Sequence, residues 1–234
     1  MAPKCSTCRL NSGARHSPSG QRRIVASYPG SLTHIDFKTF GFLRGAPGVE
    51  GVRLGGFVVV DSLTSHASVY LAKVADAIEA VAALRAYIEK APFPVKGIVL
   101  SDNGGPFLSD HWLNFCQANK LIPRRIRSSH PWSNGKVEAL NKTLKYECFA
   151  ALAGNICKWE DALNLVEVWL SFYNSTRAHT GHCNQGLPPD VFFSLYQKTP
   201  GDHLEKLDFF PDLRESVLPP VEPGKANPRL LLAK

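Results

Sequence analysis

The chain has 234 residues, of which 44% are hydrophobic and 20% charged, and its formal charge is +7. This length suits one domain of about 150 residues with flanking arms, and this composition excludes a mainly disordered chain. No apolar run approaches the ~18 residues of a membrane-spanning helix, and the N-terminus has no apolar signal region. We therefore expect a soluble intracellular protein without a membrane partner.

The first part of the chain predicts a basic arm followed by three strands. Residues 1–29 are polar and basic, whereas residues 32–40 alternate and are rich in β-formers. A glycine-rich segment over residues 41–55 is expected to form a hairpin loop. Strands over residues 57–60 and 67–71 follow it.

The middle of the chain predicts alternating helices and strands. Apolar residues recur at helical spacing in the following set: Val74, Ile78, Val81, Leu84 and Ile88. Prolines at 92 and 94 end this helix, and a short buried strand is expected over residues 96–101. A helix capped by Ser109 and a strand over residues 121–126 come next.

Two more helices are predicted before the chain becomes rich in proline. One covers residues 136–152, and the other carries an apolar stripe: Trp159, Leu163, Val166, Leu170 and Tyr173. Residues 179–234 are expected to form an extended, proline-rich tail. The whole order predicts an α/β domain over residues 30–178, with a mixed five-stranded sheet flanked by helices.

Positive charge gathers in two places. Residues 1–30 hold five basic residues and no acidic one, and residues 120–147 hold seven basic residues against Glu138 and Glu147. Two local clusters of this kind favour a polyanion as partner, so nucleic acid is a candidate.

The six cysteines do not predict a disulfide framework in a reducing compartment. Only Cys5 and Cys8 have the spacing of metal ligands, and two cysteines supply half of a four-ligand zinc site. A second group, His179, His182 and Cys183, lacks another cysteine pair. The sequence therefore predicts an incomplete zinc site at most.

Three acidic residues stand where solvated surface charges are unusual. Asp36 lies within an apolar strand, Asp102 follows a buried strand, and Glu138 lies in the first turn of a helix, with 35 residues between the last two. Carboxylates of this kind suit a pair of Mg²⁺ ions that activate an attacking oxygen and stabilise a leaving oxygen at phosphorus. The alternatives are a turn-forming aspartate and a glutamate that complements the helix dipole.

The predicted helix after Gly135 offers one face to such a site. Glu138, Lys142 and Lys145 share a side at spacings i, i+4 and i+7. A metal-binding acid and two phosphate-seeking lysines would then face one cleft, whereas an ordinary surface Glu–Lys pair is the alternative.

These residues carry a family resemblance. Asp36, Ser101-Asp102-Asn103-Gly104-Gly105-Pro106-Phe107 and Asn134-Gly135-Lys136-Val137-Glu138 resemble the Asp, Asp, 35-residue gap, Glu pattern of integrase catalytic cores. The pattern is similar to integrases of gypsy-type LTR retrotransposons and of retroviruses. Asp61 ends the second strand and is not the expected catalytic aspartate. Tyr173-Asn174 with Arg177 and His179 resembles a motif that follows the core in these enzymes.

The resemblance implies a ribonuclease H-like fold in which Asp36, Asp102 and Glu138 hold two Mg²⁺ or Mn²⁺ ions. It implies trimming of element DNA ends and their joining to target DNA, in a homo-oligomer, with nuclear location in a eukaryotic source. Lys142 and Lys145 match positions that face double-stranded element DNA. Further expected backbone contacts are Asn103, Ser133 and Asn134. Cys5 and Cys8 resemble the last two ligands of the family's zinc finger.

The sequence departs from the family in ways that leave other functions open. Trp132 stands where glutamine is common, Ala178 stands where proline is common, and the zinc finger lacks its histidine pair. The alternatives are a non-catalytic DNA- or protein-binding module derived from a captured integrase, a transposase with the same acids, and a nuclease of the same fold.

Overall fold

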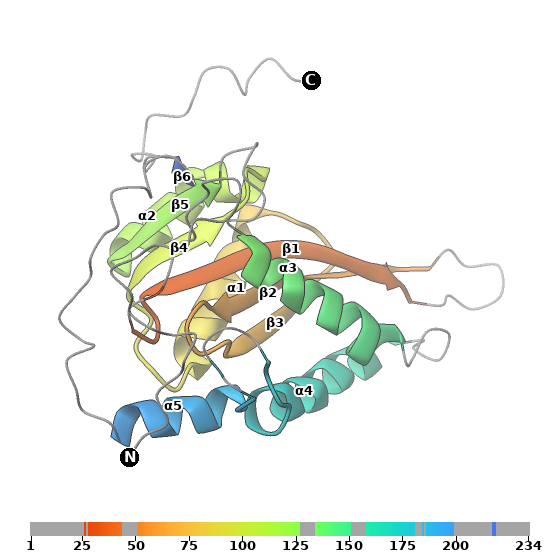
Figure 1. Cartoon of the computed structure of the whole chain (residues 1–234). Coiled ribbons are helices and arrows are strands. Elements are labelled where there is room, and N and C mark those ends of the chain that lie inside the picture. The colour runs from red at the N-terminus through yellow and green to blue at the C-terminus, as the bar shows by residue number, and fades with distance from the viewer. Residues whose placement is uncertain are drawn as a thin grey trace, which may run out of the picture.

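A mixed sheet forms the centre of the computed structural model (Figure 1). The structure describes residues 26, 28–43, 51–126, 134–150, 158–180, 184, 186–198 and 217–218. The sheet strands are β1 (Leu32–Phe42), β2 (Arg53–Asp61), β3 (Ala67–Ala72), β4 (Gly97–Ser101), β5 (Leu121–Ile126) and β6 (Val217–Leu218). Their spatial order is β3-β2-β1-β4-β5-β6, so the five expected strands are present and the two residues of β6 extend the edge.

The strand directions bring the ends of β1 and β4 together. β1, β2 and β3 pair antiparallel, whereas β4 runs parallel to both β1 and β5. The chain leaves β3 at one side of the sheet and enters β4 on the far side of β1, and α1 (Ala77–Lys90) forms this crossover. The short β6 pairs antiparallel with β5.

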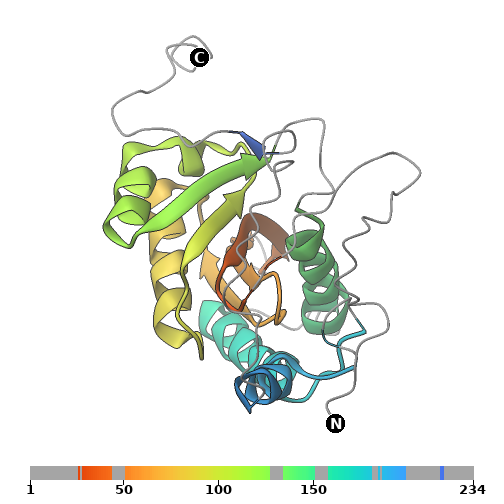
Figure 2. The ribbon, with the colours of Figure 1, turned by 60° about the vertical axis from the view of Figure 1, so that its left-hand side comes forward.

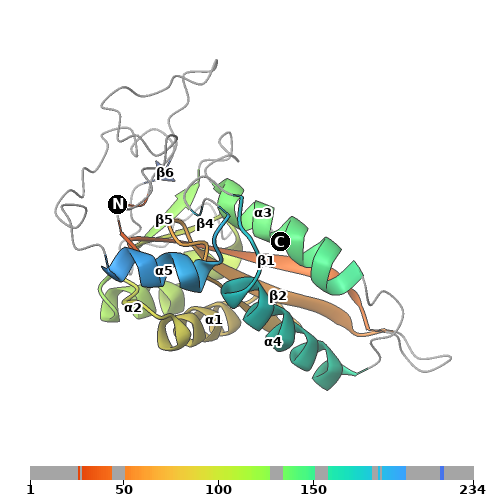
Figure 3. The ribbon, with the colours of Figure 1, turned by 60° about the horizontal axis from the view of Figure 1, so that its bottom comes forward.

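Helices cover both faces of the sheet (Figures 2 and 3). On one face lie α1 and α2 (Asp110–Ala118), preceded by the short helix η1 (Gly105–Leu108). On the other lie α3 (Gly135–Thr143), its π-helical continuation η3 (Leu144–Phe149) and α4 (Trp159–Ser175). The last helix in the described part of the chain is α5 (Pro189–Lys198), which lies beside α4.

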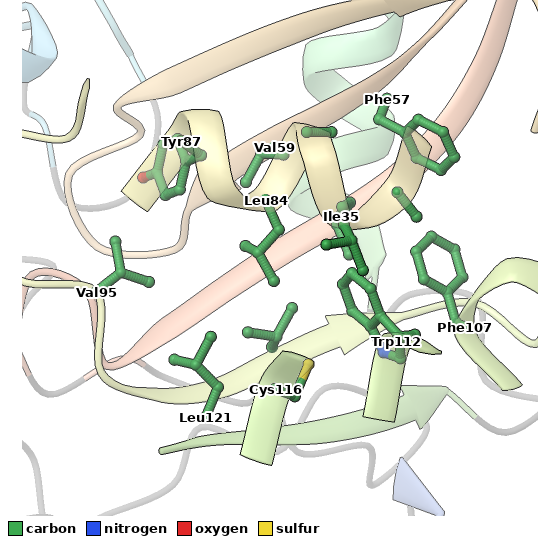
Figure 4. Packing of buried hydrophobic residues seen from close by; sticks show 14 of the residues in the cluster. Ile35, Phe57, Val59, Leu84, Tyr87, Val95, Phe107, Trp112, Cys116 and Leu121 are labelled. Carbon is green, nitrogen blue, oxygen red and sulfur yellow. The ribbon is translucent and has the colours of Figure 1, made fainter. Parts of the chain in front are cut away.

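Alternating side chains of the central strands divide the core into two layers. Ile35, Phe57 and Val59 pack with α1 and α2, as Figure 4 shows around Leu84 and Trp112. Val58 and Val60 point to the other face and pack with α3 and α4. Because β2 is covered on both faces, its apolar run is continuous rather than alternating.

Some helical faces differ from those expected. Val74 precedes α1 and Ile78 lies in its first turn, and their exposed fractions are 54% and 69%. The buried side of α1 is instead formed by Ala80, Val81, Ala83, Leu84 and Tyr87. In α4, Leu163 is exposed and Ala162 is buried instead. Both helices are therefore rotated about their axes relative to the orientation that would bury their largest apolar residues.

The boundary of the extended tail also needs correction. α5 forms within residues 179–234, which were expected to be extended. Pro189 begins this helix, where proline is tolerated because the first turn has no intrahelical acceptor for an N–H. Phe193 of α5 packs edge-on against Phe93, with ring centroids 5.2 Å apart, so the segment packs on the domain.

Several expectations concern residues outside the described ranges. These include the arm up to residue 25, Cys5 and Cys8, Ser133, and His182 and Cys183. Within the described residues, no helix has the length and apolar character required to cross a membrane.

Candidate active site

Asp36 and Asp102 lie close together at the carboxyl end of β4, where this strand runs beside β1. In this parallel pairing His34 lies opposite Leu100. Asp36 and Asp102 each come two residues later, so they lie next to each other. Asp36 remains inside β1, whereas Asp102 directly follows the end of β4. The sheet register thus brings together two acids that are far apart in the sequence.

The Asp36 carboxyl is the electrostatically perturbed member of this pair. Burial raises its pKa to about 6 from an ordinary value of 3.8, and the nearby charge of Asp102 acts in the same direction. A hydrogen bond from Asn141 Nδ2 to Asp36 Oδ2, 2.8 Å long, opposes that increase in pKa. Two carboxylates that repel each other in a partly buried place favour a cation between them.

The turn after β4 fixes the Asp102 side chain. Gly104 N donates a 2.9 Å hydrogen bond to Asp102 Oδ1, which closes a turn of the kind that aspartate favours. Asn103 is exposed, and its Nδ2 donates to the carbonyl oxygen of Ile126 on β5. Asn103 therefore links the ends of β4 and β5 and also lies on the surface, where a DNA contact was expected.

Two buried asparagines hold α3 against β1. Asn134, at the start of α3, has its Oδ1 3.2 Å from His34 Nδ1, and Asn141 donates to Asp36. Both asparagines are buried, with exposed fractions of 3% and 6%. Glu138 lies between them, since residues 134, 138 and 141 follow the i, i+4, i+7 spacing of one helical side. The backbone at Glu138 is thereby held beside the strand that carries Asp36.

The side chain of Glu138 itself is exposed. Among the described residues, no group of three His, Cys, Asp or Glu side chains is close enough to hold a metal ion. The donors that do fit a hard cation are the two aspartates, together with Asn141 Oδ1, which is buried and has no hydrogen-bond partner within the described ranges. Mg²⁺ commonly takes one or two carboxylates and completes its shell with water and phosphate oxygens.

The basic residues of this helix have the exposure that was expected of DNA contacts. Lys142 and Lys145 are both exposed. Asn134 lies elsewhere than expected, because it is buried against His34 rather than at an exposed rim. Ser133, the other residue expected at that rim, lies outside the described ranges.

The structure resolves the role of Asp61, the competing aspartate. Its buried carboxylate accepts hydrogen bonds from the backbone N–H groups of Gly30, Leu63 and Thr64 and from the Thr64 hydroxyl. Burial raises the pKa of Asp61, and these hydrogen bonds oppose the increase. Asp61 joins the start of β1 to the turn after β2, and this role is structural.

The motif after the core packs the following segment onto the domain. Asn174 exchanges two hydrogen bonds with the backbone of Ala67, each 2.9 Å long. Arg177 forms a two-pronged ion pair with Glu147. His179 is buried, and its Nε2 lies 3.2 Å from the carbonyl oxygen of Tyr173. Sequence reasoning had singled out the residues of this motif but not the partners that they contact.

Sequence reasoning missed His34 and Asn141. No local pattern marks them, since each meets a partner about 100 residues away. The only available signal was the repeated polar side of α3, where Asn134 and Asn141 flank Glu138.

Part of the site lies within a segment that matches a known protein family. Residues 119–189 match the family described as integrase core domain. This segment of the chain is therefore similar to integrase core domains. The family segment contains Glu138 and the helices α3 and α4, while Asp36 and Asp102 lie before it.

Similar chains are found in a viral polyprotein, in an intasome and in an integrase catalytic core domain. The chain is similar to the Pro-Pol polyprotein of simian foamy virus type 1, with 27% identity over 179 residues, or 73% of this chain and 15% of the polyprotein. A simian T-cell lymphotropic virus intasome bound to the PP2A regulatory subunit B56 gamma contains a similar chain. It has a TM-score of 0.63 and 20% identity, covering 86% of this chain and 65% of that one.

A second solved structure is the HTLV-2 integrase catalytic core domain in complex with magnesium, in a dimeric form. Its TM-score is 0.51 and its identity 20%, covering 65% of this chain and 92% of that domain. Similarity at this identity establishes the fold, which is the ribonuclease H-like fold of integrase catalytic cores. Our chain spans only 15% of the polyprotein length, so the activities of that whole protein are not transferred to it.

Proposed function

We propose that this integrase core is a metal-dependent polynucleotidyl transferase that trims the 3′ ends of element DNA and joins them to target DNA. The observation that carries this proposal is the pairing of Asp36 with Asp102 at one sheet edge, with α3 held across it by Asn141. The same edge of the sheet is where α/β proteins commonly place their sites.

Asp36, Asp102 and Glu138 are the proposed metal ligands, for two Mg²⁺ or Mn²⁺ ions. When bound, such ions activate the attacking oxygen and stabilise the leaving oxygen of an in-line displacement at phosphorus. Asn141 orients the Asp36 carboxylate through its hydrogen bond. The exposed Glu138 side chain turns toward the aspartates in the loaded site, since its backbone already lies beside β1.

Double-stranded DNA is the proposed partner. Lys142 and Lys145 attract its phosphates, and Asn103 and Ser133 lie at positions proposed to contact the backbone. Such contacts position DNA without reading its sequence. Joining two DNA ends requires at least two active sites, so we propose a homo-oligomer that acts in the nucleus of a eukaryotic source.

A disintegration assay tests this function directly. The full chain is incubated with branched DNA that mimics the joined product, with Mg²⁺ or Mn²⁺, and release of the two resolved products is followed. We expect metal-dependent resolution that is lost in Glu138→Gln and Asp102→Asn. Glu160→Gln is the matched control, because Glu160 is an exposed glutamate in the first turn of another helix, α4.

Two results would reject the proposal. One is branch resolution that persists in Asp102→Asn. The other is a folded chain that binds DNA but resolves no branch with either metal. The second result would favour the captured, non-catalytic binding module, an alternative that the exposed position of Glu138 also supports.

A further inference from the structure

Tyr146 carries a large aromatic ring into solvent on the helical segment that follows Glu138. It lies in η3, which continues α3, and its exposed fraction is 67%. A single exposed apolar residue is ordinary on a protein surface. The residues around Tyr146 are what distinguish it.

The ring continues the row of charged residues on α3. Glu138, Lys142 and Tyr146 succeed one another at intervals of four residues, which places them along one side of the helix. All three side chains are exposed. The row therefore runs from the proposed metal ligand, through a cation, to an aromatic ring.

A second cation lies against the ring itself. Lys145 Nζ is 5.6 Å from the Tyr146 ring centroid, within the range of a cation–π contact. In the described part of the chain, neither Lys142 nor Lys145 has an acidic partner within ion-pair distance. Both positive charges therefore remain available to an anionic ligand.

The π-helical geometry of η3 separates this ring from the core. Phe149, three residues after Tyr146, is buried and stacks on Phe40 with ring centroids 4.4 Å apart. Eleven residues of regular α-helix would place Phe149 on nearly the same side as Glu138. The wider π-helical turn instead brings Phe149 into the core and leaves Tyr146 outside, and π-helical turns frequently occur at functional sites.

An exposed aromatic ring beside two exposed lysines suits one class of ligand, a nucleic acid strand with unstacked bases. Every base has a π-face that can stack on such a ring, and lysines attract the neighbouring phosphates. A blunt duplex keeps its bases stacked and paired, so it presents mainly phosphates to this surface. The ring adds affinity only where bases are unpaired.

We propose that Tyr146 stacks on unpaired bases at a DNA end, next to the strand whose phosphates contact Lys142 and Lys145. This inference rests on the proposed function, because removal of nucleotides from a 3′ end leaves the complementary strand with unpaired 5′ bases. Tyr146 thereby gives the core a preference for trimmed ends over blunt ones.

Paired binding measurements test this proposal. The affinity of the full chain is measured by fluorescence anisotropy, with a chelator present to prevent turnover, for a blunt duplex and for the same duplex with an unpaired 5′ extension. Tyr146→Ala is expected to weaken binding of the extended DNA by about 5- to 100-fold and to change binding of the blunt duplex by less than about twofold. Tyr146→Phe is expected to retain the preference, since the ring is kept.

Two further variants separate the possible failures. Phe172→Ala, which removes an exposed aromatic ring from α4, is the matched control and is expected to change neither affinity. Lys142→Ala is expected to weaken binding of both DNAs. If Lys142→Ala weakens both but Tyr146→Ala weakens neither, the stacking proposal is rejected and the DNA-binding function stands.

The remaining outcomes are equally decisive. If Lys142→Ala affects neither DNA, this face does not bind DNA and the proposed function loses its DNA-binding surface. If Tyr146→Ala weakens blunt and extended DNA equally, or if Tyr146→Phe behaves like Tyr146→Ala, the ring does not act by stacking on unpaired bases and the proposal is rejected.

Discussion

Asn141 of α3 donates a 2.8 Å hydrogen bond to Asp36 of β1, two residues that are 105 positions apart in the sequence. This contact joins the helix that carries Glu138 to the strand that carries the first acid. The other polar atom of the same amide, Asn141 Oδ1, is buried and has no hydrogen-bond partner among the residues that the structure describes. The hydrogen bond from the Asn141 amide therefore sets the orientation of the Asp36 carboxylate.

Removing this amide is expected to impair catalysis more than folding. Asn141→Ala leaves Asp36 without its donor, and a hydrogen bond to a charged group contributes about 1.5–3 kcal/mol. We expect branch resolution to fall about tenfold or more, together with a higher Mg²⁺ concentration for half-maximal activity. Thermal unfolding of the same variant checks that the fold is retained, and an unchanged metal requirement would contradict a role in orienting Asp36.

Asp61 provides the opposite case, a buried acid whose loss affects stability. Asp61→Asn replaces one accepting oxygen by a donor and disturbs hydrogen bonds from Gly30, Leu63 and Thr64. We expect the free energy of unfolding to fall by about 1–3 kcal/mol, measured by urea denaturation. Activity per folded molecule should be retained, and complete loss of activity in a stably folded variant would return Asp61 to the candidate ligands.

Acid is expected to destabilise the protein through His66. Burial lowers the pKa of His66 to about 4 from an ordinary value of 6.5, and its Nε2 is 3.9 Å from Asp190 Oδ1. Between these two pH values the unfolded chain binds the proton that the folded chain excludes, so stability increases as pH rises through this window. The contribution of His66 between pH 5 and pH 7 is about 1–2 kcal/mol.

Urea denaturation of His66→Gln at the two pH values measures this effect. The variant is expected to lose less stability on acidification than the wild-type chain does. His111→Gln, which replaces an exposed histidine of α2, is the control and should keep the wild-type difference. An identical pH dependence in His66→Gln and wild type would show that His66 does not titrate differently in the two states.

The salt dependence of DNA binding is expected to include a contribution from the contact between Lys142 and a phosphate. Each phosphate neutralised by a lysine contributes about one unit to the slope of log affinity against log salt concentration. We expect Lys142→Ala to reduce the slope for duplex DNA by about one. Lys90→Ala, at the C-terminal end of α1 on the other face of the sheet, should leave the slope unchanged.

Local patterns alone determined the order of strands and helices from β1 to α4, and the three candidate acids. Alternation marked β1, a capping serine marked α2, and Ser109 Oγ does accept from Trp112 N in the structure. These features depend on neighbouring residues and on helical or strand periodicity, which the sequence displays directly. The family resemblance rested on such local spacing, and the residues 119–189 that match the family agree with it.

Tertiary packing decided the contacts between distant residues. The family resemblance had already set Asp61 apart from the expected catalytic acids, but only the hydrogen bonds from Gly30 and Thr64 show which structural contacts it makes. Likewise, periodicity defined α3, whereas the contacts of Asn134 and Asn141 depend on how that helix lies on β1. The same packing turned Phe149 inward and left Tyr146 exposed, because burial is set by the neighbouring elements rather than by residue type.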